Sequence, residues 1–148
     1  MIVDLSSTVV REWIVGSPVI TSRTSIATAL RLLREHGLPA LPVWEDACLA
    51  GLVDERALLR FTPSEATTLD VYELREVLEK MTVARAVTQA VAITPDTPLD
   101  EAARLMLRNA AEVLPVMDSG RPVGLLTWRA LLRATVGSSA PRPLAARA

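Results

Sequence analysis

Hydrophobic residues along the chain form two patterns, short uninterrupted runs and stripes at helical spacing. A run at residues 19–21 precedes apolar residues at 3.6-residue spacing, a pattern typical of a helix with one buried stripe: Ile26, Ala29, Leu30 and Leu33. Two further runs, 40–44 and 51–53, flank a polar turn and predict a β-hairpin. An amphipathic helix over about 55–61 closes this half.

The second half repeats this order. A run at 91–94 precedes a second helical stripe, formed by Leu99, Ala102, Ala103 and Met106. Runs at 113–117 and 123–127 flank Asp118-Ser119-Gly120, and a closing helix is expected over 128–136. We expect Thr24 and Thr97 to be helix N-caps, Pro98 to be a first helical residue and Gly37 to end its helix.

A duplication explains these matching halves. Shifting the sequence by 73 residues aligns 10–60 with 83–133 without a gap, and 17 of the 51 pairs are identical. We therefore expect repeats at 9–61 and 83–136, an inter-repeat segment at 62–82 and a flexible tail at 137–148. Within the inter-repeat segment Pro63-Ser64 ends one helix and Asp70 caps another, whose apolar positions are Val71, Leu74, Val77, Leu78 and Met81.

The predicted fold class is α+β, with two β-α-β-β-α repeats. Each repeat has helices on one face of a small sheet, so its other face is apolar and uncovered. We expect the two sheets to be apposed with pseudo-twofold symmetry. The residues expected at the centre are Leu41, Val43, Leu52, Leu114, Val116 and Leu125.

Composition excludes several classes of protein. The net charge is −1 over 148 residues, without the basic face that a nucleic-acid partner requires. Cys48 is the only cysteine, which excludes an internal disulfide. No apolar segment approaches the roughly 20 residues of a membrane span, and the first residues do not resemble a leader peptide, so we expect a cytoplasmic protein without membrane contact.

No catalytic pattern is present, and we predict that the protein is not an enzyme. His36 stands alone at a helix end, where a cation suits the helix dipole. Cys48 lies in the predicted turn, either as a small residue or as an exposed thiol. No glycine-rich phosphate loop exists, because Gly51 and Gly124 are isolated.

The repeated motifs resemble the CBS-domain family, whose members occur as tandem pairs. Leu-Pro-Val before the hairpin turn and Gly-apolar-apolar after it stand at the same spacing in both halves. The segment 67–83 is similar to the inter-repeat helix of the acetoin-utilisation branch. The resemblance implies a regulatory pair that binds AMP, ADP, ATP or S-adenosylmethionine in two clefts between the repeats. It also implies that the protein requires no cofactor.

The resemblance also implies the residues of each cleft, because each cleft combines strand residues of one repeat with a Gly-x-x-Thr-x-x-Asp segment of the other. The first cleft would contain Val15, Gly16, Ala40, Leu41, Pro42, Leu126, Thr127, Arg129 and Ala130. The second would contain Thr88, Ala90, Val113, Leu114, Pro115, Val53, Asp54, Arg56 and Ala57.

Both clefts depart from the family pattern. Ala57 and Ala130 replace the ribose-binding Asp, and Asp54 replaces the Thr that Thr127 keeps. Loss of a hydrogen bond to a charged acceptor weakens binding roughly 10- to 100-fold. The Asp54 carboxylate opposes a nearby phosphate, so that cleft should prefer nucleosides or mononucleotides to ATP.

Several interpretations stay open. Arg56 and Arg129 either bind phosphate or lie on solvated helix faces, and Thr127 either binds ribose, caps its helix or does both. Trp44 and Trp128 are expected in the core or at an interface.

The protein is a ligand sensor or, alternatively, a degenerate pair that acts only as a dimerisation or docking module. A homodimer is expected, because six leucines offer more apolar helix surface than two sheets need: Leu30, Leu33, Leu58, Leu59, Leu131 and Leu132.

Overall fold

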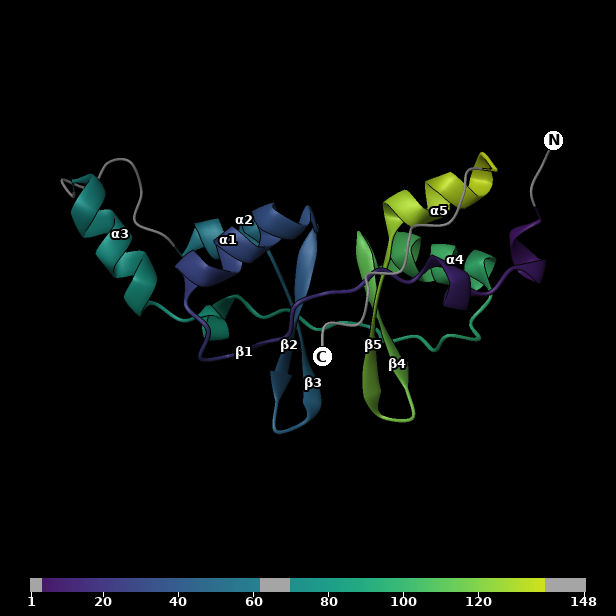
Figure 1. Cartoon of the computed structure of the whole chain (residues 1–148), viewed down its shortest axis with the longest axis horizontal. Helices are drawn as coiled ribbons and strands as arrows, with labels where there is room; N and C mark the ends of the chain where they lie inside the picture. The colour runs from purple at the N-terminus through teal and green to yellow at the C-terminus, as the bar shows by residue number, and fades with distance from the viewer. Residues whose placement is uncertain (1–3, 62–69, 138–148) are drawn as a thin grey trace. The chain divides into compact units, whose positions relative to one another are not determined.

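A computed structural model describes residues 4–61 and 70–137, which form a mixed α+β fold of the predicted class (Figure 1). The helices are α1 (Ile26–His36), α2 (Glu55–Arg60), α3 (Val71–Lys80), α4 (Leu99–Asn109) and α5 (Trp128–Thr135), with short 3-10 turns η1 (Leu5–Ser7), η2 (Val10–Trp13) and η3 (Val83–Ala86). The strands are β1 (Ile20–Thr21), β2 (Ala40–Glu45), β3 (Cys48–Asp54), β4 (Val113–Asp118) and β5 (Arg121–Thr127).

These elements belong to two compact units whose limits differ from those of the sequence repeats. Unit 2 is the continuous stretch Pro18–Gln89. Unit 1 combines Met1–Ser17 with Ala90–Ala148, so it is built from both ends of the chain. The chain therefore enters unit 2 before strand β1 of repeat 1 and leaves it before Ile93 of repeat 2.

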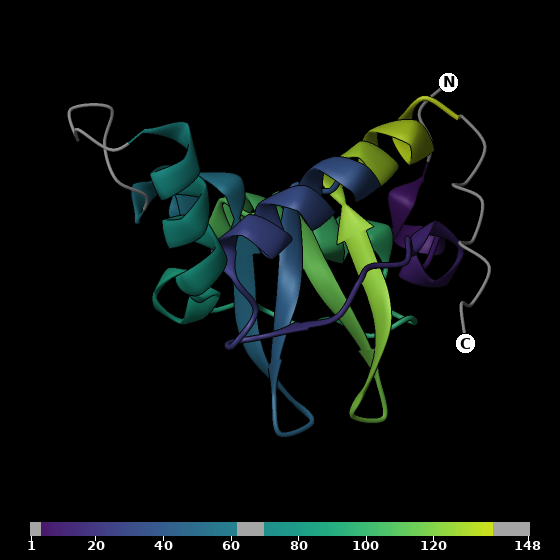
Figure 2. The same cartoon turned by 60° about the vertical axis from the view of Figure 1, so that its left-hand side comes forward.

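Unit 2 is a three-stranded sheet with helices packed on it. Strand β2 pairs in parallel with β1 and antiparallel with β3. Helices α1 and α2 contribute Ile26, Ala29, Leu33 and Leu58 to a core that also contains Leu41 and Val43 of β2. Helix α3 contacts α1 (Figure 2). Its N-cap Asp70 forms a capping box with Glu73.

Unit 1 repeats this plan around the β4–β5 hairpin. In place of a first strand, Ile93 makes a single parallel bridge to Val116 of β4. The core contains Leu99 and Met106 of α4, Leu114 and Leu126 of the hairpin, and Trp13 of the N-terminal segment.

A segment that crosses from the other repeat completes each sheet. In unit 1 the backbone N–H of Val15 donates to Leu125 O at 2.9 Å, and the N–H of Leu125 donates to Val15 O at 2.8 Å. In unit 2 Leu52 and Thr88 exchange the same two bonds at 2.9 Å each. Val15 and Thr88 each precede the first β position of their own repeat. The segment that leads into each repeat, 10–17 in repeat 1 and 83–89 in repeat 2, therefore pairs with the hairpin of the other repeat. We call these two stretches the leading segments.

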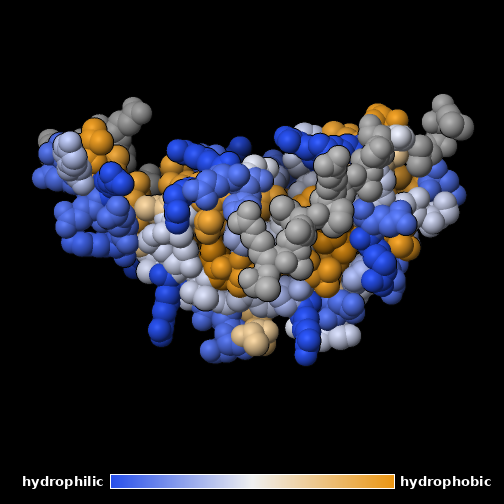
Figure 3. Space-filling model, viewed as in Figure 1, coloured by the Kyte–Doolittle hydropathy of each residue, from blue (hydrophilic) through white to orange (hydrophobic). Residues whose placement is uncertain are grey.

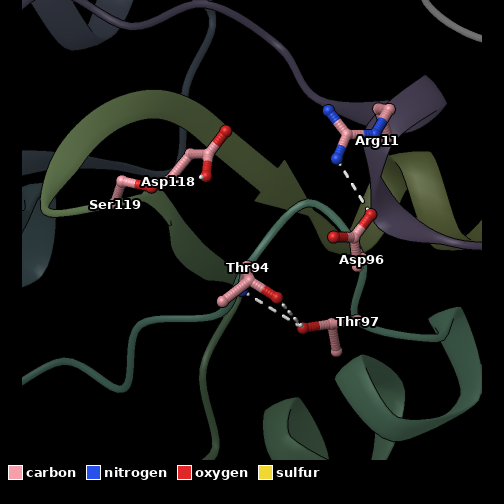
Figure 4. Close-up of polar contacts among 6 residues, drawn as sticks. All are labelled: Arg11, Thr94, Asp96, Thr97, Asp118 and Ser119. Atoms are coloured by element: carbon pink, nitrogen blue, oxygen red, sulfur yellow. Dashed lines mark hydrogen bonds and ion pairs between the residues drawn. The ribbon is translucent and has the colours of Figure 1, made fainter.

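Further contacts hold the N-terminal segment against the remainder of unit 1, the stretch that begins at Ala90. The N–H groups of Val10 and Arg11 donate to Thr97 O and Pro95 O at 2.9 Å each. The Arg11 guanidinium also lies 2.8 Å from an Asp96 carboxylate oxygen, an exposed ion pair that raises the pKa of Arg11 (Figure 4). The leading segment is therefore fixed along much of its length.

Most helix and strand predictions are confirmed. The first strand expected at 91–94 in repeat 2 was wrong, because only Ile93 forms an isolated bridge there. The other errors lie at helix starts. Ser25 and Pro98 are the N-caps of α1 and α4, so the assignment of Thr24 and Thr97 as caps, and of Pro98 as a first helical residue, was wrong. The two threonine side chains instead accept hydrogen bonds from Thr21 N and Thr94 N at 3.1 Å each, which closes the preceding turns. Gly37 ends α1 as predicted.

The six residues predicted at the centre are all buried. Leu41, Val43, Leu114 and Val116 belong to the two cores under the helices. Alternation along the strands places Leu52 and Leu125 on the opposite sheet faces. The face-to-face apposition of the sheets stays a prediction.

Three of the six leucines assigned to free helix surface were assigned wrongly. Leu33, Leu58 and Leu131 are at most 9% exposed and belong to the cores. Leu59 and Leu132 are 47% and 53% exposed, as expected. The predictions for Pro63-Ser64 and for most of the tail lie outside the described residues.

Two glycines allow the leading segments to approach. A Cβ on Gly124 would lie 2.4 Å from Val15 O, and one on Gly51 would lie 2.0 Å from Thr88 O. Both distances are far inside van der Waals contact, and the oxygens belong to backbone that is already hydrogen-bonded to the hairpin. Glycine is therefore required at both positions by the crossing segments.

Three other pairs of equivalent positions adopt left-handed backbone in both repeats. One pair is Asp46 and Ser119, and at each of the other two pairs one repeat has a glycine and the other an alanine. The helix-ending position is Gly37 (φ 59°) in repeat 1 and Ala110 (φ 50°) in repeat 2. The second position of the hairpin turn is Ala47 (φ 64°) in repeat 1 and Gly120 (φ 78°) in repeat 2. An alanine there carries steric strain that glycine does not.

Gly124→Ala should lower the free energy of unfolding by about 2–3 kcal/mol, because the new methyl group overlaps the Val15 carbonyl. Urea unfolding followed by circular dichroism measures this. Gly120→Ala is the matched control, because no atom lies within 4 Å of its Cβ position, and it should cost only about 1 kcal/mol. Equal losses in the two variants would contradict the close-approach explanation.

Ala47→Gly and Ala110→Gly should each raise the free energy of unfolding by about 0.5–1 kcal/mol, because relief of left-handed strain exceeds the entropic cost of glycine. Gly37→Ala, at the position equivalent to Ala110, should change stability in the opposite direction. Calorimetric melting of the three variants tests this, and destabilisation by either glycine would contradict it.

Candidate functional site

The junction between the hairpin and the closing helix positions the polar residues of each predicted cleft. In unit 1 Thr127 is the last residue of β5 and the N-cap of α5. Its Oγ1 accepts a hydrogen bond from Ala130 N at 3.2 Å, and the residue is only 8% exposed. The hydroxyl proton is still available to donate, so capping does not prevent a hydrogen bond to a ligand.

Asp54 occupies the equivalent junction in unit 2. It is the N-cap of α2, and its Oδ1 accepts from Ala57 N at 2.7 Å. Unlike Thr127 it is exposed, and an ionised carboxylate can only accept. The two junctions thus share one local structure but present a hydroxyl in unit 1 and an acceptor-only group in unit 2.

The leading segments lie beside these junctions. Val15 is bonded to Leu125, two residues before Thr127, and Gly16 follows it. Thr88 is bonded to Leu52, two residues before Asp54, and its Oγ1 also donates to Leu52 O at 3.2 Å. The Thr88 hydroxyl therefore braces the backbone, although its oxygen can still accept a hydrogen bond.

Several predicted cleft residues have side chains enclosed in the cores of their own units. Six of them can meet a ligand only through their backbone: Leu41, Val53, Ala57, Leu114, Leu126 and Ala130. Ala57 and Ala130 occupy the first turns of α2 and α5, where the family pattern has Asp. Their methyl groups supply no polar contact.

The remaining strand residues lie on the other sheet face by alternation. Four of them are buried: Ala40 and Pro42 of β2, and Val113 and Pro115 of β4. Ala90, just before the apolar run at 91–94, is partly buried. In unit 1 Val113 is the direct cross-strand partner of Thr127, and in unit 2 Ala40 is the partner of Asp54. Each polar N-cap is therefore flanked by an apolar strand residue.

Both helix starts also carry an exposed arginine. The Arg129 guanidinium lies 6.0 Å from the ring centroid of Trp128. Arg56 of α2 is exposed, and its neighbour Glu55 lies 3.5 Å from Arg34. Neither Arg56 nor Arg129 has a carboxylate partner within residues 4–61 and 70–137, so each cation is available to an anion.

The structure brings together part of each predicted set. Unit 1 contains Val15, Gly16, Leu126, Thr127, Arg129 and Ala130 of the first cleft, whereas Ala40, Leu41 and Pro42 are in unit 2. Unit 2 contains Val53, Asp54, Arg56, Ala57 and Thr88 of the second cleft, whereas Ala90, Val113, Leu114 and Pro115 are in unit 1. The joining of these sets in one cleft stays a prediction.

Sequence reasoning missed the structural use of the leading segments and the burial of Trp13. The indole N–H groups of Trp13 and Trp44 are buried without an acceptor in the part of the chain that the structure describes. A sequence signal existed for the segments, because the alignment of the repeats begins at Val10 and Val83, ahead of the first β runs.

Residues 4–61 and 70–137 contain neither a candidate metal site nor a membrane-spanning helix. These residues include no group of three or more His, Cys, Asp or Glu arranged to hold a metal ion. None of their helices is long and apolar enough to span a bilayer. Cys48 is exposed and is the first residue of β3 rather than part of the turn.

Among curated proteins, the chain is similar to an inosine-5'-monophosphate dehydrogenase of Korarchaeum cryptofilum, with 32% identity over 82% of this chain. It is also similar to the chloroplastic CBS domain-containing protein CBSX2 of Arabidopsis thaliana, with 30% identity over 80% of this chain. The chain spans 22% and 58% of the lengths of these two relatives.

Solved structures show the same fold. A crystal structure of CBSX2 in complex with AMP matches with a TM-score of 0.68 at 30% identity, covering 88% of this chain and 98% of that one. The CBS domain of a bacterial CNNM/CorC family Mg²⁺ transporter in complex with ATP matches with a TM-score of 0.71 at 21% identity, covering 90% and 91%. The second likeness bears on the fold alone.

The family model for the CBS domain matches residues 10–64 and 83–137, which begin at the same residues as the internal repeat and end four residues later. The match includes both hairpins, both closing helices and both leading segments. This chain therefore belongs to the CBS-domain family and carries a tandem pair of these domains.

Proposed function

We propose that this protein is a non-enzymatic regulatory module that binds an adenine nucleotide at its two hairpin–helix junctions and responds by a change in conformation or assembly. The observation that carries the proposal is the likeness to CBSX2, which was solved with AMP and which this chain matches over 98% of that chain's length. A homodimer and a cytoplasmic location are further parts of the proposal.

The chemistry of the junctions supports this proposal. Backbone and apolar strand residues suit an adenine ring, a hydroxyl or carboxylate at the N-cap suits ribose, and the arginine at the helix start suits phosphate. AMP is the first ligand to test, because Ala57 and Ala130 remove a ribose contact and each helix start carries one exposed arginine without a carboxylate partner among the described residues, Arg56 or Arg129.

The two junctions should differ in ligand preference. Thr127 and Arg129 present a hydroxyl and a cation, so unit 1 should tolerate a larger negative charge. Asp54 places a carboxylate beside Arg56, which partly cancels the attraction of the arginine for phosphate. Unit 2 should therefore prefer adenosine or AMP to ATP.

A second candidate function is a docking module that binds no nucleotide. The observation in its favour is the burial of Ala57 and Ala130 in the cores at the positions of the ribose-binding Asp. This candidate predicts that no adenine nucleotide or adenosyl compound stabilises the protein.

Thermal-shift measurement with AMP, ADP, ATP and S-adenosylmethionine distinguishes the two functions. A ligand at about 100 times its Kd stabilises the folded state by about 2.7 kcal/mol. For a chain of this length this should raise Tm by about 5–10 °C. A flat response to all four compounds at millimolar concentration would favour the docking module.

Exchange of the two N-caps tests which junction binds which ligand. Asp54→Thr removes a carboxylate near the phosphate position and should raise ATP affinity about tenfold. Thr127→Asp adds a carboxylate there and should lower ATP affinity by a similar factor. Both residue types cap helices well, so folding should change little. Isothermal titration of the two variants and the wild type measures this, and tighter binding of ATP than of AMP at the wild-type Asp54 junction would contradict the assignment.

A further inference from the structure

Trp128, the first residue of α5, directly follows the N-cap Thr127 and lies under the guanidinium of Arg129. The Arg129 Cζ lies over the Trp128 ring, 6.0 Å from its centroid. Trp128 is 42% exposed and belongs to neither hydrophobic core, so the core position that the sequence left open for it is excluded. Figure 3 shows hydrophobic and hydrophilic surface side by side along α5. The ring is therefore available to a neighbouring side chain rather than needed for core packing.

Stacking on a ring holds an arginine without using its hydrogen-bond donors. The guanidinium presents its flat face to the ring, and its five N–H groups, which lie in its plane, remain free. An ion pair with a carboxylate would instead occupy one or two of these donors. The Glu112 carbonyl accepts a hydrogen bond from Trp128 N at 3.0 Å, yet Arg129 forms no ion pair with Glu112 or another carboxylate within residues 4–61 and 70–137. Trp128 thus restricts Arg129 and leaves its donors to an anion.

The equivalent position of the other repeat carries the opposite chemistry. Trp128 corresponds to Glu55, which lies 3.5 Å from Arg34 and directly precedes Arg56. The stretch Asp54-Glu55-Arg56 contains two carboxylates and one arginine, a formal charge of −1, whereas Thr127-Trp128-Arg129 contains one arginine and no carboxylate, a formal charge of +1. The two junctions therefore differ at two successive positions, the N-cap and the residue after it.

We infer that Trp128 is a positioning residue, which holds Arg129 in place for a phosphate group at the unit 1 junction and so sets the phosphate affinity of that junction. This inference rests on the proposed function, because it concerns how a bound nucleotide is held. Arg129 donates to the phosphate, and Trp128 acts through Arg129 without touching the ligand. At the unit 2 junction Glu55 replaces the ring, so Arg56 lacks this support.

A positioning role and a merely structural role make different predictions. If the ring only stabilises the start of α5, its loss should weaken binding of a nucleoside and of its monophosphate alike, because both depend on the same junction. If the ring positions Arg129, its loss should weaken binding of the monophosphate alone. Adenosine and AMP are therefore the matched pair of probes, since they differ only by the phosphate.

Substitution of Trp128 tests the inference by isothermal titration with these two probes. Trp128→Leu should lower AMP affinity about 2–5-fold, the effect of an exposed cation–π contact, and leave adenosine affinity unchanged. Trp128→Phe keeps an aromatic face and should retain most of the AMP affinity. Trp128→Glu places a carboxylate beside Arg129 and should lower AMP affinity about tenfold, while an acidic residue in the first turn suits the helix. Leu132→Ala, which removes another exposed apolar side chain of α5, is the control and should change neither affinity.

A double-mutant cycle tests whether Trp128 acts through Arg129. Arg129→Gln should lower AMP affinity by itself, because it removes the cation. In the Arg129→Gln background Trp128→Leu should change AMP affinity no further, since the group that the ring positions is absent. A further loss in that background would show that Trp128 acts in another way, and would overturn the inference.

Tryptophan fluorescence gives a readout that is specific to this junction. Trp13 and Trp44 are buried, so the difference in emission between the wild type and Trp128→Phe reports the exposed Trp128. Saturating AMP should change this emission, because the phosphate moves or fixes the guanidinium over the ring, and adenosine should not. An emission that AMP leaves unchanged would overturn the inference.

The titrations separate failure of this inference from failure of the proposed function. Equal losses of AMP and adenosine affinity in Trp128→Leu would assign the ring a structural role and overturn the inference, while nucleotide binding itself would stand. A wild-type protein that binds neither probe at millimolar concentration would refute the proposed function, and this inference with it.

Discussion

Antiparallel pairing between the leading segment of each repeat and the hairpin of the other is the interaction on which the remaining structure depends. The pairs Val15–Leu125 and Leu52–Thr88 each exchange two backbone hydrogen bonds, and Gly124 and Gly51 leave room for them. This pairing adds a third element to each hairpin. It also ends two residues before the N-caps Thr127 and Asp54, so the same contact that completes the sheet fixes the flank of each candidate binding position.

Because the two repeats share one fold, a difference between equivalent residues shows which positions the fold constrains and which it does not. Where the backbone needs glycine for close approach, both repeats have kept it. At two positions where only left-handed backbone is needed, one repeat has an alanine. At the N-caps, Thr127 and Asp54 preserve the capping bond but differ in charge. Close backbone approach therefore constrains the two repeats more strictly than left-handed turns or the charge of the N-cap do.

Much of the fold could be predicted from the sequence because its signals are local. Helical spacing located α1 and α4, Asp70 located the start of α3, and the turn at Ser119-Gly120 located the second hairpin. The composition of the two units could not be predicted in this way, since Val15 and Leu125 lie far apart in the sequence and no local pattern links them. The helix starts were misplaced because Thr24 and Thr97 hydrogen-bond backward to Thr21 and Thr94. At the candidate site the motif gave the residues, but only the structure shows that six of their side chains face the cores.

The discontinuous composition of unit 1 has a consequence for synthesis of the chain. Unit 2 is one uninterrupted stretch, so all of its residues are present once Gln89 has left the ribosome. Val15 is made before unit 2, but its pairing partner Leu125 is made after it. During translation the apolar side chains of Val10 and Trp13 therefore remain without the core residues that they contact until the segment after unit 2 has been made.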